Sequence, residues 1–423
     1  MVTPFLRLIA AAAGLVLVLA TLRSAVRTFV LPRSARDPVT RFVFVATRAL
    51  FDLRLRWARD FATRDRVMAL FSPVAILGLV VAWGLLIVVG YAGVFWATGS
   101  PVGRAFVESG SSLLTLGFEK PVGWAAIVAA FTEAGIGLTL VALLVSYLPA
   151  MYSAFSRREA AVTLLEIRAG SPPSAGELLT RVHELGGFDG LDAYWADWQQ
   201  WFVELEESHT SLAALTFFRS PQPQRSWVTA AGAVLDSVSL VGAVLERGPS
   251  PQERMTLRAG VFALRRIAEF FAIPYEAQPD PGGPVSVRRH EFDAVYERLR
   301  AEGLEVGVPA EQAWADFVAA RVQYDDVLLE LATLTMAPNA PWSSDRALRV
   351  EHGKDPMAGG GRARASRLVE WRRGLLRGAG RPRAAPRVAD PTSLGNGSGD
   401  PLRDAQGPID RNGASRGQPT PTR

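Results

Sequence analysis

Two stretches of this chain are long enough to cross a bilayer and are almost free of charge. Residues 67–103 contain no Asp, Glu, Lys or Arg, and residues 121–156 contain one, Glu133. A third apolar run, residues 4–22, contains only Arg7. Since about 20 apolar residues span the hydrocarbon core of a membrane, each run predicts a transmembrane helix. We therefore expect an all-α membrane protein with three spanning helices.

The distribution of arginine predicts the orientation of these helices. Residues 23–66 hold eleven arginines and four aspartates, and such segments stay on the cytoplasmic side. Arg157 and Arg158, after the third apolar run, are then also cytoplasmic, and the segment between the second and third helices lies at the outer face. The same rule argues against a cleaved signal peptide. We expect a multi-pass protein of the bacterial inner membrane with a cytoplasmic C-terminus.

Residues 37–62 have the pattern of an amphipathic helix. The apolar face, with a spacing of three or four, consists of Phe42, Ala46, Leu50, Leu53, Trp57 and Phe61. Arginines and Asp52 occupy the opposite face. A helix of this kind either lies in the membrane interface or packs on a cytoplasmic domain. We assign residues 1–30 to the first spanning helix and residues 31–66 to this arginine-rich interfacial segment.

Residues 160–345 predict a cytoplasmic, all-helical domain. Residues 189–212 have strong helical periodicity, and their apolar stripe, expected to be core, consists of Trp195, Trp198, Phe202 and Leu205. Further helices are expected at residues 226–246, 253–272, 289–303 and 309–336. Ser174 and Glu177 match a helix-capping box. No alternation typical of strands is present.

The composition changes beyond this domain to Gly, Pro, Arg, Ala, Ser and Asp, which predicts a disordered basic tail over residues 346–423. Residues 362–387 carry nine arginines and one acidic residue. A short helix at residues 366–377 is a candidate for contact with anionic lipid, and a solvated tail is the alternative. Since Trp371 is the only aromatic residue among these arginines, no nucleic-acid partner is expected.

Composition also argues against an enzyme. The chain has no cysteine and four histidines, which excludes disulfides, thiolate metal sites and a catalytic thiol. His209 follows three glutamates, but no second histidine stands at ligand spacing, so no metal site is predicted. The GGFDG segment at residues 186–190 lacks the spacing of a nucleotide-binding loop. We expect no catalytic residues and no cofactor.

A polar segment, GSSLLTLGFEKP at residues 110–121, separates the second and third apolar runs. Non-helical backbone at membrane depth persists only where protein buries it or water reaches it, because lipid cannot satisfy its polar groups. Residues 103–114 are long enough for a half-helix, after which TLGF can return as extended chain. This layout is that of a re-entrant pore loop between an outer helix and an inner helix.

These elements together resemble the pore module of the tetrameric potassium-channel superfamily, and the resemblance covers residues 67–159. In that family four chains each supply a Thr-Val-Gly-Tyr-Gly filter, whose carbonyls replace the hydration shell of the ion. The selectivity filter that the resemblance implies consists of Thr115, Leu116, Gly117, Phe118 and Glu119. The gating hinge that it implies consists of Gly135 or Gly137, with Pro149 as a kink in the inner helix.

Two residues depart from the family's filter. Glu119 replaces the second glycine, whose backbone angles favour glycine, so we expect strain there. Lys120 replaces an aspartate. The resemblance still implies a homotetrameric, potassium-like cation channel with an atypical filter, which conducts monovalent cations and is regulated by its cytoplasmic domain. The alternative is a non-conducting, membrane-anchored scaffold or sensor, and a membrane-tethered enzyme would need a polar pocket in residues 160–340.

Glu133 is the one charged residue of the third apolar run. An ionisable group at that depth faces protein or water. It is expected to support the loop by hydrogen-bonding the half-helix near Ser111, Ser112 or Thr115, because polar groups there need partners. The alternative is a position beside a water-filled cavity, where its charge would attract cations.

Overall fold

The computed structural model describes residues 2–30, 37–55, 57, 60–185, 191–304 and 306–346 of the chain. The predicted tail beyond residue 346, its short helix at 366–377 and the GGFDG segment lie outside the described residues. Over the described part, the regular secondary structure is helical, apart from one isolated β-bridge between Leu245 and Val306. The all-α prediction is confirmed.

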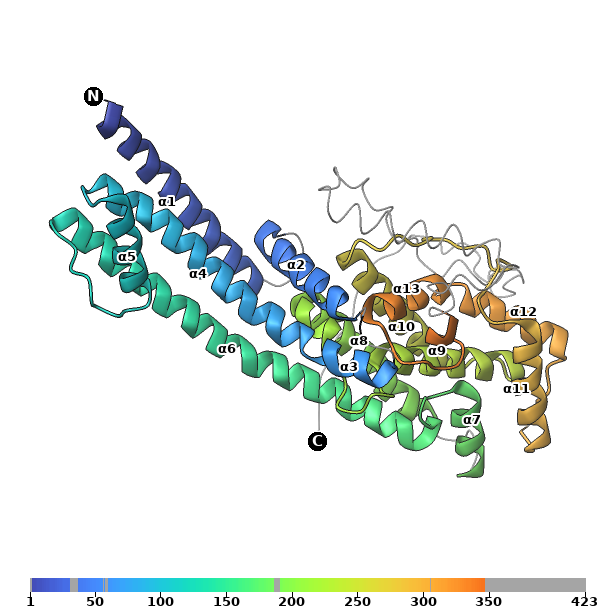
Figure 1. The fold of residues 1–423 in the computed structure, drawn as a ribbon. Coiled ribbons are helices and arrows are strands. Elements are labelled where there is room, and N and C mark those ends of the chain that lie inside the picture. The colour runs from blue at the N-terminus through green and yellow to red at the C-terminus, as the bar shows by residue number, and fades with distance from the viewer. Residues whose placement is uncertain are drawn as a thin grey trace, which may run out of the picture. The chain divides into compact units, whose positions relative to one another are not determined.

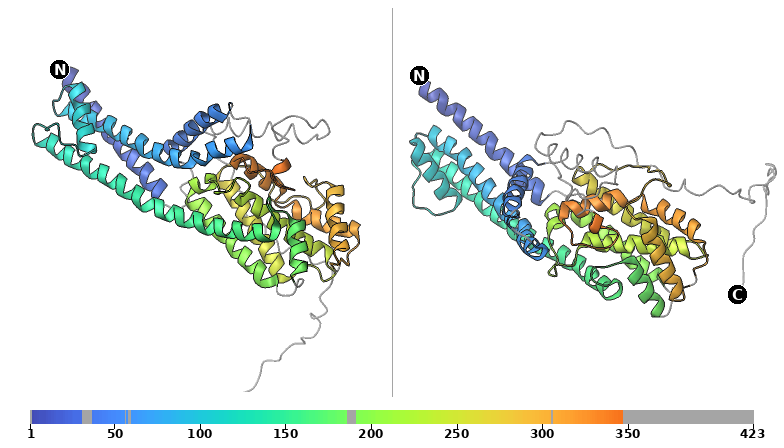
Figure 2. Two further views of the ribbon diagram at one scale, coloured as in Figure 1. Left: turned by 60° about the horizontal axis from the view of Figure 1, so that its bottom comes forward. Right: turned by 45° about the vertical axis from the view of Figure 1, so that its right-hand side comes forward.

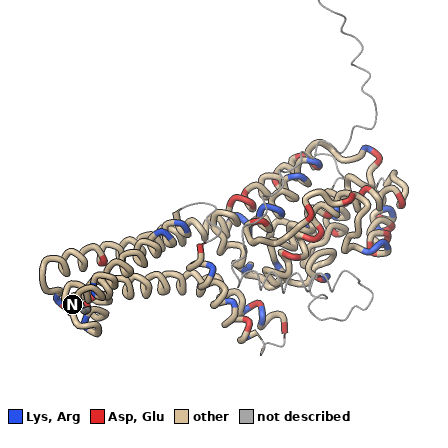
Figure 3. The backbone as a smooth tube through the Cα atoms, turned by 90° about the horizontal axis from the view of Figure 1, so that it is seen from above, with Lys and Arg blue, Asp and Glu red and all other residues tan. Residues whose placement is uncertain are grey.

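In the part of the chain that the structure describes, four helical stretches are long and apolar enough to cross a membrane. Three of them are α1 (Val2–Phe29), α4 (Phe71–Ala97, preceded by α3, Phe61–Ala69) and α6 (Trp124–Ala169), and the fourth is α9 (Trp227–Val244) (Figure 1). Other helices cover α9, since 94% of its apolar stretch is buried, against 17% in α1, 39% in α4 and 17% in α6. Charged residues are sparse along α1, α4 and α6 (Figure 3). The chain thus has the character of a membrane protein.

The helices α1 and α4 pack side by side at close range (Figure 2). A Cβ atom added to Gly14 would lie 2.2 Å from the carbonyl oxygen of Gly90, and one added to Gly93 would lie 2.7 Å from that of Ala10. Glycine is therefore required at these positions by the approach of the two backbones. Small residues have this role between membrane helices, where close packing takes the place of the hydrophobic effect.

The amphipathic helix is shorter than the 37–62 that the sequence predicts. Helix α2 (Pro38–Leu55) ends at Leu55, and α3 begins after Asp60. The Asp60 carboxylate accepts a hydrogen bond from the Thr63 amide at 2.9 Å. This contact is a helix N-cap, so Asp60 starts a new helix instead of continuing the old one. Phe61 consequently belongs to α3.

Beyond α6, the described residues of the helical domain form seven α-helices and one 3-10 helix. Their bounds are α7 (Ala175–Glu184), α8 (Leu191–Ser211), η1 (Ala213–Phe217), α9, α10 (Pro251–Phe270), α11 (Arg289–Ala301), α12 (Ala310–Arg321) and α13 (Asp325–Thr335). The predicted aromatic stripe of α8 is buried in the core, as expected. Ser174 accepts a hydrogen bond from the Glu177 amide at 3.3 Å and caps α7.

Helix α6 continues without a break past residue 159, the end of the segment that resembles a pore module. Its last turns enter the core of the helical domain through Val162, Leu165 and Ala169.

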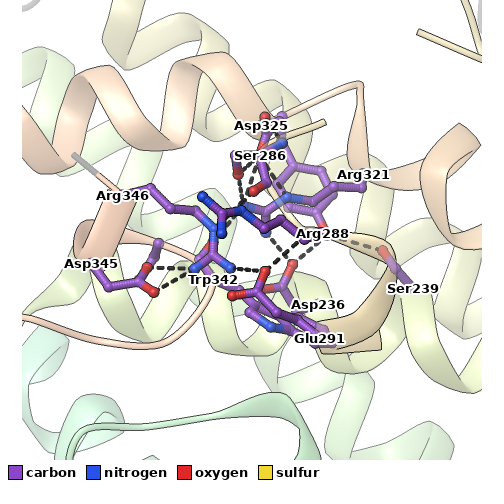
Figure 4. A network of polar contacts seen from close by, with 12 residues as sticks. Asp236, Ser239, Ser286, Arg288, Glu291, Arg321, Asp325, Trp342, Asp345 and Arg346 are labelled. Atoms are coloured by element: carbon purple, nitrogen blue, oxygen red, sulfur yellow. Dashed lines mark hydrogen bonds and ion pairs between the residues drawn. The ribbon is translucent and has the colours of Figure 1, made fainter. Parts of the chain in front are cut away.

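The single helix predicted at residues 309–336 is two helices, α12 and α13, and a buried polar network lies where they meet (Figure 4). Arg321 is fully buried and forms ion pairs with Asp236 of α9 and, at 2.8 Å, with Asp325. It also donates to the Trp342 carbonyl oxygen at 2.5 Å, and the Tyr324 hydroxyl donates to Asp236 at 2.8 Å. The break between the helices lets Arg321 reach both carboxylates.

Candidate functional site

The candidate site is the segment between α4 and α6, which contains α5 (Val102–Leu113) and the turn that follows it. The turn folds back on the end of α5. The Leu116 amide donates to the Ser111 carbonyl at 2.8 Å, and the Thr115 amide donates to that of Ser112 at 3.0 Å. The Glu119 amide makes a longer contact, 3.4 Å, with the Ser111 hydroxyl. These hydrogen bonds to Ser111 and Ser112 therefore hold the turn against the C-terminal end of α5.

Helix α5 buries its polar side and exposes apolar residues. Glu108, Ser109 and Ser111 are 2%, 0% and 2% exposed. Val102, Phe106 and Val107 are exposed instead. A surface helix of a soluble protein has the opposite arrangement. Polar groups that face protein, with apolar groups outward, are typical of a helix at membrane depth.

The turn after α5 has left-handed backbone at alternate residues. Thr115 has φ 53° and Gly117 has φ 71°, while Leu116 and Phe118 between and after them do not have positive φ. Glycine adopts this conformation freely, whereas threonine is strained by roughly 1–2 kcal/mol. Glu119 is not left-handed, so the expectation of strain at that residue is wrong. The strained non-glycine residue is Thr115.

The carbonyls of this turn are free. All residues from 114 to 118 are exposed, and no described residue donates a hydrogen bond to the main-chain carbonyl oxygens of residues 115–118. In an extended strand successive carbonyls alternate in direction, and left-handed residues change that alternation. Exposed main-chain carbonyl oxygens are groups that can coordinate hard monovalent cations.

An arginine connects the start of α5 to the end of the turn. The Nε atom of Arg104 lies 2.7 Å from a carboxylate oxygen of Glu119 and 3.2 Å from one of Glu108. The Ser100 hydroxyl donates to the other Glu108 oxygen at 2.8 Å. Glu119 is therefore paired with Arg104, and not with its sequence neighbour Lys120. The spacing of Arg104 and Glu108 would have predicted their pair, but not the contact with Glu119.

Glu133 lies on α6, is fully buried, and contacts α5. The Ser109 hydroxyl lies 2.5 Å from its Oε1 atom and 3.1 Å from the Val88 carbonyl oxygen of α4. The partner is thus Ser109, which precedes the expected Ser111, Ser112 and Thr115 in the chain, because Ser109 is on the side of α5 that faces α4 and α6. Among the described residues, the Oε2 atom of Glu133 has no partner. Ser109 joins three helices at one point.

The three residues of the implied hinge lie in an unbroken α6. A Cβ atom added to Gly137 would lie 2.2 Å from the Leu113 carbonyl oxygen, at the end of α5. One added to Gly135 would have no atom within 4 Å. Pro149 is exposed inside the helix. Close packing on α5 thus accounts for the glycine at 137, while the role of Gly135 and Pro149 as a hinge stays a prediction.

Alanine substitutions separate these two glycines. Gly137→Ala forces α5 and α6 apart and should destabilise their packing by about 1–3 kcal/mol. Gly135→Ala meets open space and should stabilise the helix by about 0.5–1 kcal/mol, because alanine is the better helix former. Thermal unfolding of the full chain in detergent measures both. A larger loss of stability for Gly135→Ala than for Gly137→Ala would contradict the α5–α6 contact.

Comparisons of the chain with models of protein families, with curated proteins and with solved structures gave no match. The resemblance to the potassium-channel superfamily stays a prediction. It depends on the sequence pattern of residues 67–159. No group of three potential metal-ligating side chains is found within the described ranges.

A second polar cluster joins α6 to the helical domain. Arg158 is buried and donates to the carbonyl oxygens of Leu215 and Phe218 at 3.0 and 2.8 Å. Its NH1 group lies 3.2 Å from Nε2 of His209, whose Nδ1 lies 3.0 Å from the Leu205 carbonyl oxygen. A guanidinium only donates and a carbonyl only accepts, so His209 is the neutral tautomer with its hydrogen on Nδ1.

This geometry predicts loss of stability in acid. Burial, and then the Arg158 guanidinium, lower the pKa of His209 well below 6.5. The unfolded chain therefore binds the proton first as pH falls, and stability that is complete above about pH 6.5 decreases by about 1.4 kcal/mol per pH unit below it. His209→Gln keeps an acceptor for Arg158 and removes the titration. Melting temperatures at pH 7.5 and 5.5 should differ less in this variant than in the unsubstituted protein, and an equal difference would contradict the assignment.

Proposed function

We propose that the chain is a subunit of a homotetrameric cation channel, with potassium-like conduction through residues 115–119. The observation that carries this proposal is the row of free carbonyls at residues 115–118, held by α5 between two helices of membrane-spanning length. Carbonyl oxygens that converge on an axis can replace the hydration shell of a monovalent cation. The polar, buried side of α5 supports a re-entrant position for that helix.

Assembly follows from this geometry. One turn cannot surround an ion, so a filter of this kind needs four copies around an axis. Leu114, Leu116 and Phe118 are 64%, 57% and 63% exposed in the single chain. Neighbouring subunits would cover these side chains on one side while the carbonyls face the axis. The proposed subunit spans a bacterial inner membrane with α1, α4 and α6, and has residues 98–123 at the outer face and the helical domain in the cytoplasm. The eleven arginines of residues 23–66 support this orientation.

The helical domain is proposed to regulate the pore through residues 213–218. Arg158 of α6 donates to the carbonyl oxygens of Leu215 and Phe218, and Ser72 at the start of α4 donates to the Ala214 carbonyl at 3.0 Å. This short segment therefore contacts both the inner and the outer helix. If α8 or α9 shifts, residues 213–218 would shift with it, and their contacts would move α4 and α6 together.

Flux through liposomes tests the proposal. Purified full-length protein should dissipate a potassium gradient, and its mass in detergent should be that of four chains. Gly117→Val should abolish flux without changing the mass, because valine does not adopt the left-handed conformation of this residue. Gly103→Ala is the matched control, since this glycine lies in α5 with open space around it. We expect that variant to conduct.

Two results would overturn the channel. A stable monomer leaves no axis for the filter. An intact tetramer without potassium or sodium flux favours the non-conducting scaffold or sensor instead. Flux that is equal in the Gly117→Val and Gly103→Ala variants would place the ion path elsewhere in the protein.

A further inference from the structure

Helix α2 has two apolar faces, and protein covers one of them. Val43 and Leu55 are buried, and the Phe44 and Phe51 rings lie 6.1 and 5.7 Å from the Phe71 ring at the start of α4. The other face remains exposed. It consists of Phe42, Ala46, Ala49, Leu50 and Leu53, of which the three large side chains are 72%, 64% and 53% exposed. Because protein covers only the first face, the exposed apolar face needs another apolar medium to keep it from water.

One arginine of α2 lies beside this exposed face and another lies on the covered side. Arg54 is exposed next to Leu53, whereas Arg48 pairs with Asp52 at 3.0 Å and has its guanidinium 5.8 Å from the centre of the Phe71 ring. Trp57, just beyond the last turn, is 84% exposed. An apolar face with an exposed arginine beside it and an exposed tryptophan at its end matches the layered chemistry of a bilayer surface, where acyl chains lie below the headgroups.

The position of α2 points to lipid as the covering medium. Val43 packs with Leu79 and Trp83 of α4 in one cluster, so α2 lies along the first half of a membrane-length helix. The neighbouring surface of α4 exposes further large apolar residues, namely Val74 (41%), Leu77 (56%) and Val81 (61%). The medium that covers this part of α4 extends to the exposed face of α2.

We propose that α2 is an interfacial anchor whose exposed face, Phe42, Ala46, Ala49, Leu50 and Leu53, is inserted into the lipid leaflet at the arginine-rich end of the spanning helices. Its other face fixes this anchor to α4 through Val43 and the phenylalanine rings. This inference goes beyond the proposed function and does not depend on conduction.

The chain has no cysteine, so single spin labels can be placed without a background. We would label Ala46→Cys and Ala49→Cys, both small exposed positions, in the full chain in vesicles of phosphatidylcholine and phosphatidylglycerol. The control is Val203→Cys on α8, where the side chain is 51% exposed in the helical domain. Power saturation measures the collision of each label with oxygen, which partitions into lipid, and with a water-soluble nickel chelate.

We expect oxygen to dominate at residues 46 and 49, at a depth of about 5–10 Å below the headgroups, and the nickel chelate to dominate at residue 203. Nickel accessibility at residues 46 and 49 equal to that at 203 would overturn the inference, because the face would be in water. Exclusion of both reagents, with dipolar broadening between labels, would also overturn it and place a second copy of the chain on this face.

Discussion

Arg321→Met is expected to lower the free energy of unfolding of the helical domain by about 3–5 kcal/mol, because it removes the buried guanidinium that pairs with two buried carboxylates. Asp236 and Asp325 are 1% and 2% exposed, and Arg321 is fully buried between them. A loss of that size is a large share of the stability of an ordinary domain. Urea unfolding of the full chain in detergent, followed by tryptophan fluorescence, measures it.

A matched control comes from an arginine of the same domain with the same number of acidic partners. Arg289 pairs with Asp293 and Glu311, both at 2.7 Å, but its side chain is 34% exposed. Arg289→Met should leave the urea midpoint nearly unchanged, since water already solvates these charges. A further variant, Arg321→Met with Asp236→Asn and Asp325→Asn, should recover part of the loss. Equal effects of Arg321→Met and Arg289→Met would contradict the buried network.

The apolar content of the chain predicts much of the fold, because a helix in lipid is specified mainly by length and hydropathy. The same property cannot assign α9, which is as apolar as a short spanning helix yet is covered by its neighbours in the domain. Only tertiary contacts separate the two cases. The helical period also did not mark the break in the helix predicted at residues 309–336. At that break the buried Arg321 contacts Asp236, a residue 85 positions away in the chain.

Local sequence patterns explain why the exposed face of α2 was predicted correctly and its end was not. The apolar face of α2 follows its period, and Phe42, Leu50 and Leu53 all lie on it. The end of that helix was predicted too late, although Asp60 with Thr63 three residues on is a capping pattern that the sequence contains. A hydrophobic period does not mark helix ends, whereas caps do.

The candidate site was predictable as a segment but not in its contacts. Serine, threonine and glycine between two spanning runs indicate non-helical backbone, and the structure has a short helix and a turn there. The contacts of Ser109 with Glu133 and of Arg104 with Glu119 join residues 24 and 15 positions apart. Their partners depend on which side of α5 faces α4 and α6, and one helix of twelve residues with mixed polarity does not reveal that side.

Arg104 is expected to set the charge that Glu119 presents to cations in the proposed channel. Glu119→Gln removes one negative charge per subunit, four in the proposed tetramer, and leaves Arg104 at the mouth, so cation flux at low salt should fall by up to about a hundredfold. A unit charge about 6 Å from the ion path in water contributes about 0.7 kcal/mol, and four such charges contribute about 2.8 kcal/mol before screening. Arg104→Gln should raise cation flux. It removes the guanidinium whose Nε atom lies 2.7 Å from the Glu119 carboxylate, so that carboxylate loses its counter-charge.

The second variant needs one more change. Glu108 is buried and shares Arg104 with Glu119, so Arg104→Gln is made together with Glu108→Gln to avoid an uncompensated buried charge. In that protein the net charge of the three side chains stays at −1 per subunit, but the charge that remains is the Glu119 carboxylate without its guanidinium, whereas the carboxylate that was removed is buried. Cation flux at low salt should therefore rise, and external divalent ions should block more strongly. Both effects should shrink as ionic strength approaches about 0.1 M, where screening acts over about 10 Å. Adding Glu119→Gln removes the last of the three charges, so flux at low salt and block by divalent ions should both decrease again. Flux that is indifferent to all three variants, in a protein that conducts, would mean that Glu119 is remote from the ion path and that the pair only fastens the turn to α5.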